Sequence, residues 1–493
     1  MMRFCCSVKL LCLVASIATV HLNAQSSEAV PAIQRELRAT WVTSVYNLDW
    51  PSKVGLSEKK QKQELIELLD NCQHLNLNAI FLQVRPEGDA LYNSKLEPWS
   101  HWLTGKMGKS PGYDPLAFCI AEAHRRGIEV HAWINPFRAL TDISRKVNSK
   151  HFSLRKDLVF KKVGNKLWLD PSYVGNRRWV VDVIDDIVSR YNIDGVHMDD
   201  YFYPYPSFDE DKNIKDPFPD KVEHQRYLSA GGDKDIEAWR RENIDIFIQS
   251  VAAKIKARKP WVRFGISPFG IWRPGVPAGT DAQVSSYDHL ACDSLKWAKE
   301  GWVDYLTPQL YWAIDSEQSF YKLMQWWAIQ SNVPIWPGLD VDRIFSKKEP
   351  SRNAEEILEQ VILSRQLGMK YQQSQGQAFW RSSAVLGNKD KVANKLKRYF
   401  YAQKALLPPL NTSFKPQAPK SPQVNLVKNS KGWELTCVLN SHRAVVQFKL
   451  QGRWQQLNTL YGNIKLNFNE KPEIIIATPV GIYGHLGEPT VVK

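Results

Sequence analysis

Cysteine is scarce in this chain, and so are the motifs of a metalloprotein. The 493 residues include seven cysteines, of which Cys72, Cys119, Cys292 and Cys437 follow the first twelve positions. They are widely spaced and form no CxxC pair, which excludes a disulfide scaffold and disfavours a zinc site. We expect buried free thiols, with a Cys72–Cys119 disulfide as the alternative. The sequence has no HExxH motif and no calcium-type aspartate loop, so no metal or cofactor is expected.

Long hydrophobic runs are absent after the N-terminus. Residues 1–24 read as a signal peptide, with Arg3 and Lys9 before an apolar run over 10–20 that is too short to span a bilayer. Cys12 follows two leucines rather than a small residue, which disfavours a lipid anchor. The sequence therefore predicts a periplasmic or secreted protein without stable membrane insertion.

The charge is strongly basic but has no block. The formal net charge is +14, and loss of the two signal-peptide cations would leave +12. No run of Lys and Arg reaches five, so a nucleic-acid partner is not expected. An anionic polymer, such as cell-wall glycan, and an ordinary basic surface both remain open. The hydrophobic share of 43% excludes a disordered chain and supports a large core.

A strand-helix alternation repeats eight times between residues 36 and 400. The pattern predicts strands at 38–42, 79–84, 129–134, 195–198, 263–266, 305–310, 334–339 and 376–379. It predicts the helices between and after them at 59–75, 115–126, 177–191, 237–258, 287–300, 319–330, 354–367 and 389–399. Eight such units indicate an α/β fold, a (β/α)8 TIM barrel over 25–406. A doubly wound open sheet is the alternative, but no glycine-rich phosphate turn follows the first strand.

The sequence changes character after residue 406. Residues 407–422 hold five prolines and read as a linker. Residues 423–493 carry short β-type runs at 424–427, 432–439, 444–450 and 474–478. These predict a small all-β sandwich of the fibronectin-III-like type. Spacing or weak attachment is its expected role.

Polar and aromatic residues follow the predicted strands where the chain enters the loops. In a TIM barrel these strand ends form the active-site mouth. Aromatic faces stack on the C–H faces of sugar rings, and amide, imidazole and guanidinium groups pair with hydroxyls. The alternative is that several aromatics only cap the barrel core. The residues expected to bind substrate are Arg85, His131, Trp133, Asn135, His197, Tyr201, Tyr203, Trp272, Gln309, Tyr311, Trp312 and Trp380.

Asp199 is the leading catalytic candidate. Along the fourth strand Val196 and Met198 share one face, so Asp199 should share the other and point into the barrel mouth. It would act as a general acid, base or nucleophile; pairing with Arg85, Arg138 or His197 is the structural alternative. Asp200 should turn away or begin the loop, although the two carboxyl groups would shift each other's pKa.

The second carboxyl group that glycoside hydrolysis usually requires is not obvious. Asp89 and Asp200 are the secondary catalytic candidates, and Asp89 is equally well explained as a turn residue. A substrate-assisted route, in which an N-acetyl group is the nucleophile, needs only one protein acid/base. Further candidates are Glu87, Asp170, Asp315, Asp340 and Asp342.

Several of these strand-end runs resemble the bacterial glycosyl-hydrolase-like family ten. The matching runs are 36–42, 84–90, 98–100, 131–136, 194–204, 265–270 and 308–312, and the Asp-Asp-Tyr-Phe-Tyr-Pro run at 199–204 is the most specific. The resemblance implies an exported barrel hydrolase, and at least one branch of the family cleaves peptidoglycan strands stripped of their stem peptides. The Asp-Gly-x-x-x-Asp segment is also similar to chitinase-type and amylase-type strands. Both comparisons favour Asp199, whereas the chitinase-type acid would fall on Tyr201.

Together these observations predict an exported glycoside hydrolase, expected as a monomer. Its substrate would be an amino-sugar glycan, with peptidoglycan strands lacking stem peptides favoured by the resemblance. Three alternatives stay open: a non-catalytic glycan-binding barrel, a hydrolase of dietary or host polysaccharide, and a polyanion-binding surface protein.

Overall fold

The computed structural model describes residues 29–208, 214–215, 218–347, 349, 351–373, 375–439, 443–459 and 463–493. The predicted signal peptide at 1–24 lies outside the described residues. No helix within those ranges combines the length and apolarity needed to cross a bilayer. The four cysteines expected to be free are all buried thiols without a disulfide.

Eight parallel strands form the central sheet of the molecule, in the order β12-β11-β8-β4-β3-β2-β14-β13. Trp336 N–H donates to the Leu306 carbonyl at 2.9 Å, and Gly338 N–H to that of Pro308 at 2.8 Å. These bonds join the two outer strands of the order, so the sheet closes on itself and the predicted (β/α)8 barrel is confirmed. The strands are β2 (Leu37–Val42), β3 (Ala79–Arg85), β4 (Glu129–Ile134), β8 (Gly195–Met198), β11 (Arg263–Ile266), β12 (Tyr305–Leu306), β13 (Gly338–Asp340) and β14 (Gly376–Trp380).

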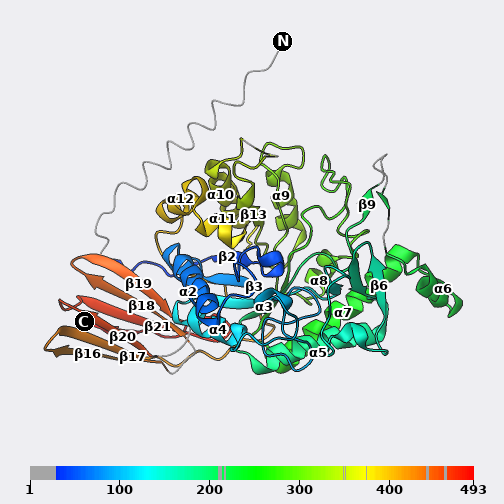
Figure 1. Cartoon of the computed structure of the whole chain (residues 1–493). Helices are drawn as coiled ribbons and strands as arrows, with labels where there is room; N and C mark the ends of the chain where they lie inside the picture. Colours follow the sequence, from blue (N-terminus) through cyan, green and yellow to red (C-terminus); the bar gives the residue numbers. More distant parts are fainter. Residues whose placement is uncertain are drawn as a thin grey trace, which may run out of the picture.

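Helices follow the strands around the barrel (Figure 1). They begin where the sequence supplies caps: Asp114 accepts the Ala117 N–H at 3.0 Å, and Pro115 occupies the first turn. The main helices are α2 (Glu58–His74), α4 (Pro115–Arg125), α5 (Val174–Arg190), α7 (Ile236–Arg258), α8 (Ser294–Lys299), α9 (Phe320–Gln330), α10 (Ala354–Lys370) and α12 (Val392–Tyr399). The remaining helices are α3 (His101–Thr104), α6 (Lys221–Ser229) and α11 (Ser382–Leu386).

The fifth helix is shorter than predicted, and the expectation of a helix over 287–300 is wrong at its start. Ala291 has φ 53°, in the left-handed region, which a right-handed helix cannot pass through. Asp288 is held by Arg273 at 2.9 Å instead of facing along a helix. The helix therefore begins at Ser294, where Asp293 caps the Lys296 N–H at 3.3 Å.

Several other boundaries also differ from the predictions, among them those of the sixth strand, the seventh strand and the eighth helix. The sixth strand ends at Leu306 and the seventh begins at Gly338. Pro308 and Pro337 lack the N–H that a continuous ladder needs there. The eighth helix begins at Val392, since Lys391 has φ 58°.

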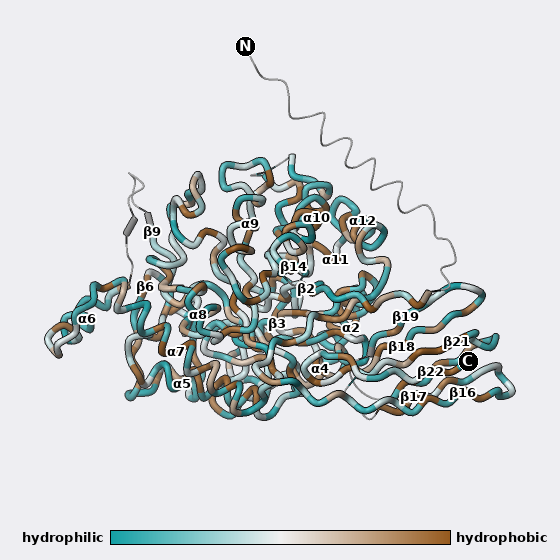
Figure 2. Tube along the Cα trace, turned by 180° about the vertical axis from the view of Figure 1, so that it is seen from behind, coloured by the Kyte–Doolittle hydropathy of each residue, from teal (hydrophilic) through white to brown (hydrophobic). Residues whose placement is uncertain are grey.

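Aromatic side chains fill the interior of the barrel. A cluster buried among the strands includes Trp41, Phe81, Trp133, Tyr305 and Trp336. The hydropathy colouring in Figure 2 shows the central strands mostly brown, with teal segments more frequent toward the outside. The loops after β4 and β8 add a small sheet of order β5-β7-β6 and a hairpin, with strands β5 (Arg138–Leu140), β6 (Phe160–Val163), β7 (Lys166–Leu169), β9 (Ser207–Phe208) and β10 (Ile214–Lys215).

The C-terminal strands form two sheets at one side of the barrel (Figure 1). One has the order β16-β17-β20 and the other β19-β18-β21-β22. Residues from both sheets, among them Leu435, Val446 and Phe468, share one buried cluster, so the sheets pack face to face. We call this unit the C-terminal sandwich. Its strands are β16 (Gln423–Asn429), β17 (Gly432–Val438), β18 (Arg443–Leu450), β19 (Arg453–Thr459), β20 (Ile464–Phe468), β21 (Ile474–Val480) and β22 (Thr490–Val492). The sequence predicted four of them; β19, β20 and β22 were missed.

The proline-rich segment 407–422 has no helix or strand, yet it is attached on both sides. Arg263 of the barrel donates to the Pro408 carbonyl at 2.6 Å, and Leu410 N–H to the Tyr483 carbonyl of the sandwich at 2.8 Å. Before it, β1 (Gln34–Arg35) pairs in parallel with β15 (Ala405–Leu406). The segment thus lies against both parts, and its role as a boundary stays a prediction.

Candidate active site

A cavity of about 260 Å³ opens at the carboxyl ends of the barrel strands. This is the face where active sites of TIM barrels lie. Each of six barrel strands, β2, β3, β4, β8, β11 and β14, contributes residues at or just beyond its end, and so does the segment after β12. The lining residues are Trp41, Thr43, Val45, Tyr46, Leu48, Gln83, Trp133, Asp199, Asp200, Tyr201, Tyr205, Ser267, Gln309, Tyr311 and Trp380.

Two adjacent carboxyl groups, Asp199 and Asp200, share this cavity. Asp199 is half-buried and accepts hydrogen bonds from Gln309 Nε2 at 3.2 Å and from the Asp200 N–H at 3.1 Å. Asp200 is only 1% exposed and accepts a hydrogen bond from the Tyr205 hydroxyl. The strand ends at Met198, so the alternation that placed Asp199 does not govern Asp200, which begins the loop and still lines the cavity.

The environment of the pair favours the protonated form of its carboxyl groups. Burial, and then the negative charge of Asp199, raise the pKa of Asp200 well above its usual range. Burial also raises the pKa of Asp199, against hydrogen bonds from Asp200 and Tyr201 that lower it. Two close carboxyl groups of this kind titrate as one unit that retains a proton to higher pH than a free aspartate.

A chain of amide and hydroxyl groups holds the wall beside the pair. Gln83 Oε1 accepts the Ser44 and Val45 N–H groups at 3.0 and 2.9 Å. Its Nε2 donates to Asn135 Oδ1 at 2.7 Å, and Asn135 Nδ2 contacts the Tyr201 hydroxyl. Because these groups are bonded to one another, Asn135 acts on the cavity through Tyr201 and does not itself line it.

Aromatic rings form most of the remaining wall. Trp380 lies edge-on to Trp41 at 6.0 Å and to Trp133 at 6.2 Å, and tilted to Tyr311 at 6.3 Å, measured between ring centroids. Tyr46 stands at the rim, 56% exposed, with φ 57°. The partly exposed rings of Tyr311 and Trp380 and the exposed ring of Tyr46, around a polar floor, suit a sugar ring, which presents apolar C–H faces and polar edges.

Three of the predicted residues lie inside the protein rather than at the cavity. His131 and His197 are fully buried in the barrel interior, where both contact the Tyr305 hydroxyl, at 2.8 and 3.1 Å. Arg85 is fully buried and holds Glu97 with hydrogen bonds of 2.6 and 2.8 Å. The sequence could not show this depth, because strand alternation gives the face of a residue but not its height along the barrel axis.

Four other candidates lie elsewhere. Asp89 is buried and accepts the His101 N–H at 3.0 Å, which supports the turn interpretation; burial and Glu87 raise its pKa to about 8. Tyr203 is buried below the guanidinium of Arg240. Trp272 packs against Tyr287 and Trp326, and Trp312 lines a separate groove beside Arg352 and Glu356.

None of the other carboxyl candidates lines the cavity, within the part of the chain that the structure describes. Asp340, at the end of β13, resembles the carboxyl pair in being buried with a raised pKa. It is 6% exposed, and burial raises its pKa to about 6. It is paired with Arg343 at 3.0 Å. Glu87 is paired with Arg145, and Asp170 holds the Ser172 N–H at 2.9 Å.

Sequence reasoning missed eight cavity residues: Trp41, Thr43, Val45, Tyr46, Leu48, Gln83, Tyr205 and Ser267. Five of these come from the first strand and the turn after it, and Gln83 and Ser267 from the ends of two other strands. A signal was available, since the turn after the first strand carries Tyr46 and Leu48, two large apolar side chains that a turn does not need and that are 56% and 41% exposed. Tyr205 follows the pair by only a few residues.

The structure thus defines a class: a (β/α)8 barrel whose mouth holds a carboxyl pair within an aromatic wall, as in enzymes that act on sugars. A family model described as "Glycosyl hydrolase-like 10" matches residues 36–353. The chain belongs to this family, as the motif resemblance predicted, and the predicted enzyme class, a glycoside hydrolase, is confirmed.

Relatives with curated names extend the comparison. Glycosyl hydrolase YngK of Bacillus subtilis (strain 168) is 39% identical over 429 residues, covering 84% of this chain and 79% of that protein. Glycosyl hydrolase DigH of Escherichia coli (strain K12) is 36% identical over 336 residues, covering 64% of this chain and 74% of that protein. Among solved structures, the PgaB (BpsB) glycoside hydrolase domain from Bordetella bronchiseptica has a TM-score of 0.48 at 14% identity, covering 74% of this chain and 98% of that one.

Proposed function

We propose that the protein hydrolyses an amino-sugar glycan, with peptidoglycan strands lacking stem peptides as the substrate, by a substrate-assisted mechanism. The observation that carries this proposal is the arrangement of carboxyl groups. Asp199 and Asp200 are neighbours on one wall, and among the described residues no carboxylate lines the opposite wall. A mechanism with two carboxyl groups across the scissile bond would need one there.

An N-acetyl group on the substrate would supply the missing nucleophile. Its carbonyl oxygen bonds to the anomeric carbon while the glycosidic bond breaks and leaves its electron pair on the departing oxygen. That oxygen takes a proton from Asp199, the member of the pair that faces the cavity. Water then opens the cyclic intermediate and returns a proton to the pair.

Each member of the pair has its own role in this scheme. Asp200, buried and bound by Tyr205, makes the pair retain a proton to higher pH than a free aspartate, because burial and the charge of Asp199 raise its pKa. Gln309 Nε2 donates a hydrogen bond to Asp199 and thereby orients its carboxyl group.

The cavity, at about 260 Å³, is at the small end of ligand sites. Such a volume favours one bare sugar unit over a sugar that carries a peptide.

The test is a digest of purified cell-wall glycan, with and without stem peptides, read by mass spectrometry. We expect the wild type to release oligosaccharides from stripped strands and Asp199→Asn to release none. Chemically de-N-acetylated strands should resist cleavage, because the internal nucleophile is gone. Cleavage of de-N-acetylated strands at the normal rate would contradict the substrate-assisted step.

Three other outcomes correspond to the alternatives. Binding without release by either form would indicate a non-catalytic barrel. Release from dietary or host polysaccharide, and none from stripped cell wall, would reassign the substrate. Binding that falls steeply with salt and is unchanged by substitution of Asp199 would indicate a polyanion-binding protein.

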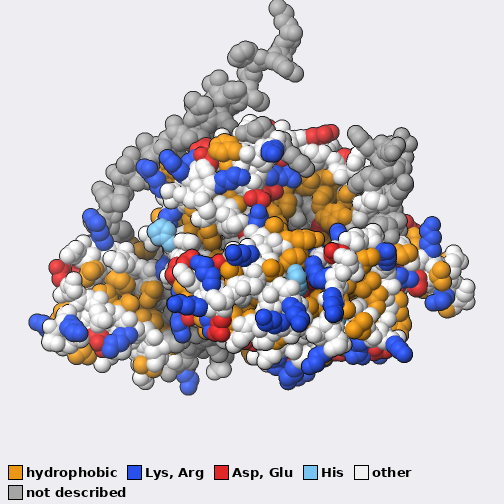
Figure 3. Space-filling view, viewed as in Figure 1, with side chains coloured by type: hydrophobic (Ala, Val, Ile, Leu, Met, Phe, Trp, Pro, Cys, Tyr) orange, Lys and Arg blue, Asp and Glu red, His pale blue; other side chains and the backbone are white. Residues whose placement is uncertain are grey.

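On the face seen in Figure 3, blue Lys and Arg side chains are scattered among red acidic ones rather than gathered in one patch.

A further inference from the structure

Polar side chains form a continuous line through the barrel interior, from the floor of the cavity to the face that the C-terminal sandwich covers. His197 Nε2 lies 3.2 Å from Trp41 Nε1, and His197 Nδ1 lies 3.1 Å from the Tyr305 hydroxyl. The same hydroxyl lies 2.8 Å from His131 Nδ1, and His131 Nε2 lies 3.5 Å from Glu129 Oε2. We call these five side chains the axial chain; all are at most 2% exposed.

The chemistry of its members fixes which group donates and which accepts at each hydrogen bond of the axial chain. An indole N–H can only donate, so Trp41 donates to His197 Nε2. Burial holds the pKa of His197 well below its usual value, so the ring is neutral and its hydrogen is on Nδ1, facing Tyr305. Tyr305 then gives its single hydrogen to His131 Nδ1. Because His131 Nδ1 accepts, the His131 hydrogen is on Nε2, which lies within ion-pair distance of Glu129 Oε2, at 3.5 Å, without a hydrogen bond to it.

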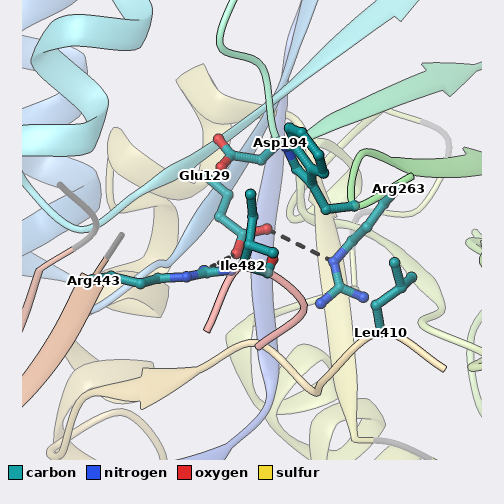
Figure 4. A pocket seen from close by; sticks show the side chains of 7 residues that line it. Glu129, Asp194, Arg263, Leu410, Arg443 and Ile482 are labelled. Carbon is teal, nitrogen blue, oxygen red and sulfur yellow. Dashed lines mark hydrogen bonds and ion pairs between the residues drawn. The ribbon is translucent and has the colours of Figure 1, made fainter. Parts of the chain in front are cut away.

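The lower end of the axial chain is completed by the sandwich. Arg443 is the first residue of β18. Figure 4 shows its side chain reaching Glu129 from one side, while Arg263 approaches Glu129 from the other. The Arg443–Glu129 pair is at 2.5 Å and the Arg263–Glu129 pair at 3.9 Å. Arg443 is therefore the main countercharge of a carboxylate that is 1% exposed. A buried carboxylate without such a partner would take up a proton and could then donate, so the chain would lose its direction.

The upper end reaches the groups that shape the cavity. The Trp41 indole is part of the cavity wall. Ser267 Oγ lies 3.1 Å from His197 Nε2, and the Ser267 carbonyl accepts from Gln309 Nε2 at 3.0 Å. Gln309 Nε2 is the group that also donates to Asp199.

We propose that the C-terminal sandwich is part of the catalytic unit, with Arg443 as a positioning residue that anchors the axial chain and thereby orients Trp41 and the Gln309–Asp199 contact. The proposal assigns the sandwich a role beyond spacing. Its kinetic test rests on the proposed function, whereas its spectroscopic test does not.

The spectroscopic test is 15N NMR of full-length protein labelled at histidine. In the wild type we expect His197 to carry its hydrogen on Nδ1 and His131 on Nε2, with signals assigned from His131→Gln and His197→Gln. Arg443→Met should shift the His131 signals toward the other tautomer or the protonated ring, and Arg443→Lys should restore them. Arg453→Met, an exposed arginine of the same sandwich, is the matched control. Unchanged His131 signals in Arg443→Met would overturn the proposal.

The kinetic test is a double-mutant cycle. Arg443→Met and Tyr305→Phe should each lower kcat about tenfold with KM changed less than about twofold, since the cavity wall remains in place. If the chain acts as one unit, the double variant is no slower than the slower single variant. An additive loss of about a hundredfold would show two independent structural effects and contradict the proposal. A wild type that cleaves no glycan would refute the proposed function alone, and the NMR result would still decide the role of Arg443.

Discussion

At the scale of single residues, Asp199 and Asp200 differ in what each side chain can reach. Asp199 is half-buried and faces the cavity, whereas Asp200 is 1% exposed and bound by the Tyr205 hydroxyl. Proton transfer requires contact with the substrate oxygen, so the two positions should respond differently to the same substitution.

Asp199→Asn is expected to lower kcat by about 10²–10⁴-fold, the usual contribution of a positioned acid/base. Asp200→Asn should cost less, because its carboxyl group acts through Asp199. The measurement is the initial rate of glycan hydrolysis, with thermal unfolding to confirm the fold. Asp182→Asn, at an exposed position of α5, is the control and should match the wild type. Equal losses at Asp199 and Asp200 would argue that both carboxyl groups touch the substrate.

The pH profile follows from the same pair. Because burial raises both pKa values, the acid stays protonated to higher pH than a free aspartate, and kcat/KM should fall only as pH rises through the upper pKa of the pair. Asp200→Asn removes the group whose pKa is raised most, so the alkaline limb should move to lower pH. A limb that stays in place in this variant would show that another group sets it.

Tyr46 combines exposure with an unfavourable backbone conformation. It is 56% exposed at the cavity rim with φ 57°, and such positions persist where function holds them. We expect Tyr46→Ala to raise KM about tenfold with little change in kcat, through loss of a stacking face. Tyr46→Phe should retain most of the affinity. A loss of kcat with unchanged KM would instead place Tyr46 in the chemical step.

At the scale of elements, the barrel strands pack their interior rings against glycine. A Cβ on Gly265 of β11 would lie 2.1 Å from the Tyr305 ring, and one on Gly195 of β8 would lie 2.5 Å from His131 Nδ1. These two strands therefore need glycine so that the rings of the axial chain can lie across them. The sequence shows the glycines, but only the closed barrel shows which ring each one faces.

Gly265→Ala should destabilise the protein by about 1–3 kcal/mol, because the Tyr305 ring must shift within a packed core. The same substitution at Gly368, inside α10, meets no atom closer than 3.5 Å and should stabilise by about 0.5–1 kcal/mol. Denaturant unfolding of both variants measures whether the free energy of unfolding falls for the first substitution and rises for the second. A neutral result at Gly265 would mean that the interior rings have room to move.

At the scale of the whole molecule, the barrel and the C-terminal sandwich are joined by apolar contact as well as by the ion pair at Glu129. Leu406, Val445 and Val480 form a buried cluster with Ile33 packed against it. Asn458 Nδ2 also donates to the Ala405 carbonyl at 3.2 Å. An interface with both kinds of contact should make the two parts unfold together.

Calorimetry of the wild type should therefore show one thermal transition. Val445→Asp places an unpaired carboxylate in the apolar cluster and should split the transition in two, with the sandwich and barrel unfolding separately. Val427→Asp, at a 49% exposed position of the same sandwich, should leave a single transition. Two transitions already in the wild type would refute the coupling.

The sequence by itself determined the order of strands and helices in the barrel and the place of Asp199 in the cavity. Eight apolar runs alternating with amphipathic segments allow few architectures, because each strand must bury two faces and each helix one. Asp199 could be placed in the mouth since side-chain alternation holds along a strand of known face. The predicted helix over 287–300 was wrong at its start, because the local contacts of Asp288 and the left-handed conformation of Ala291 outweigh the helical periodicity of the sequence.

Only the tertiary structure decided which strand ends meet and how deep each side chain lies. His131 and His197 share the inward face with Asp199, but they lie lower along the axis, so they became part of the interior rather than of the wall. Tyr46 and Gln83 reach the cavity because the closed barrel brings the turn after its first strand beside the end of its second. Arg443 meets Glu129 across 314 positions of sequence, a contact that no local pattern encodes.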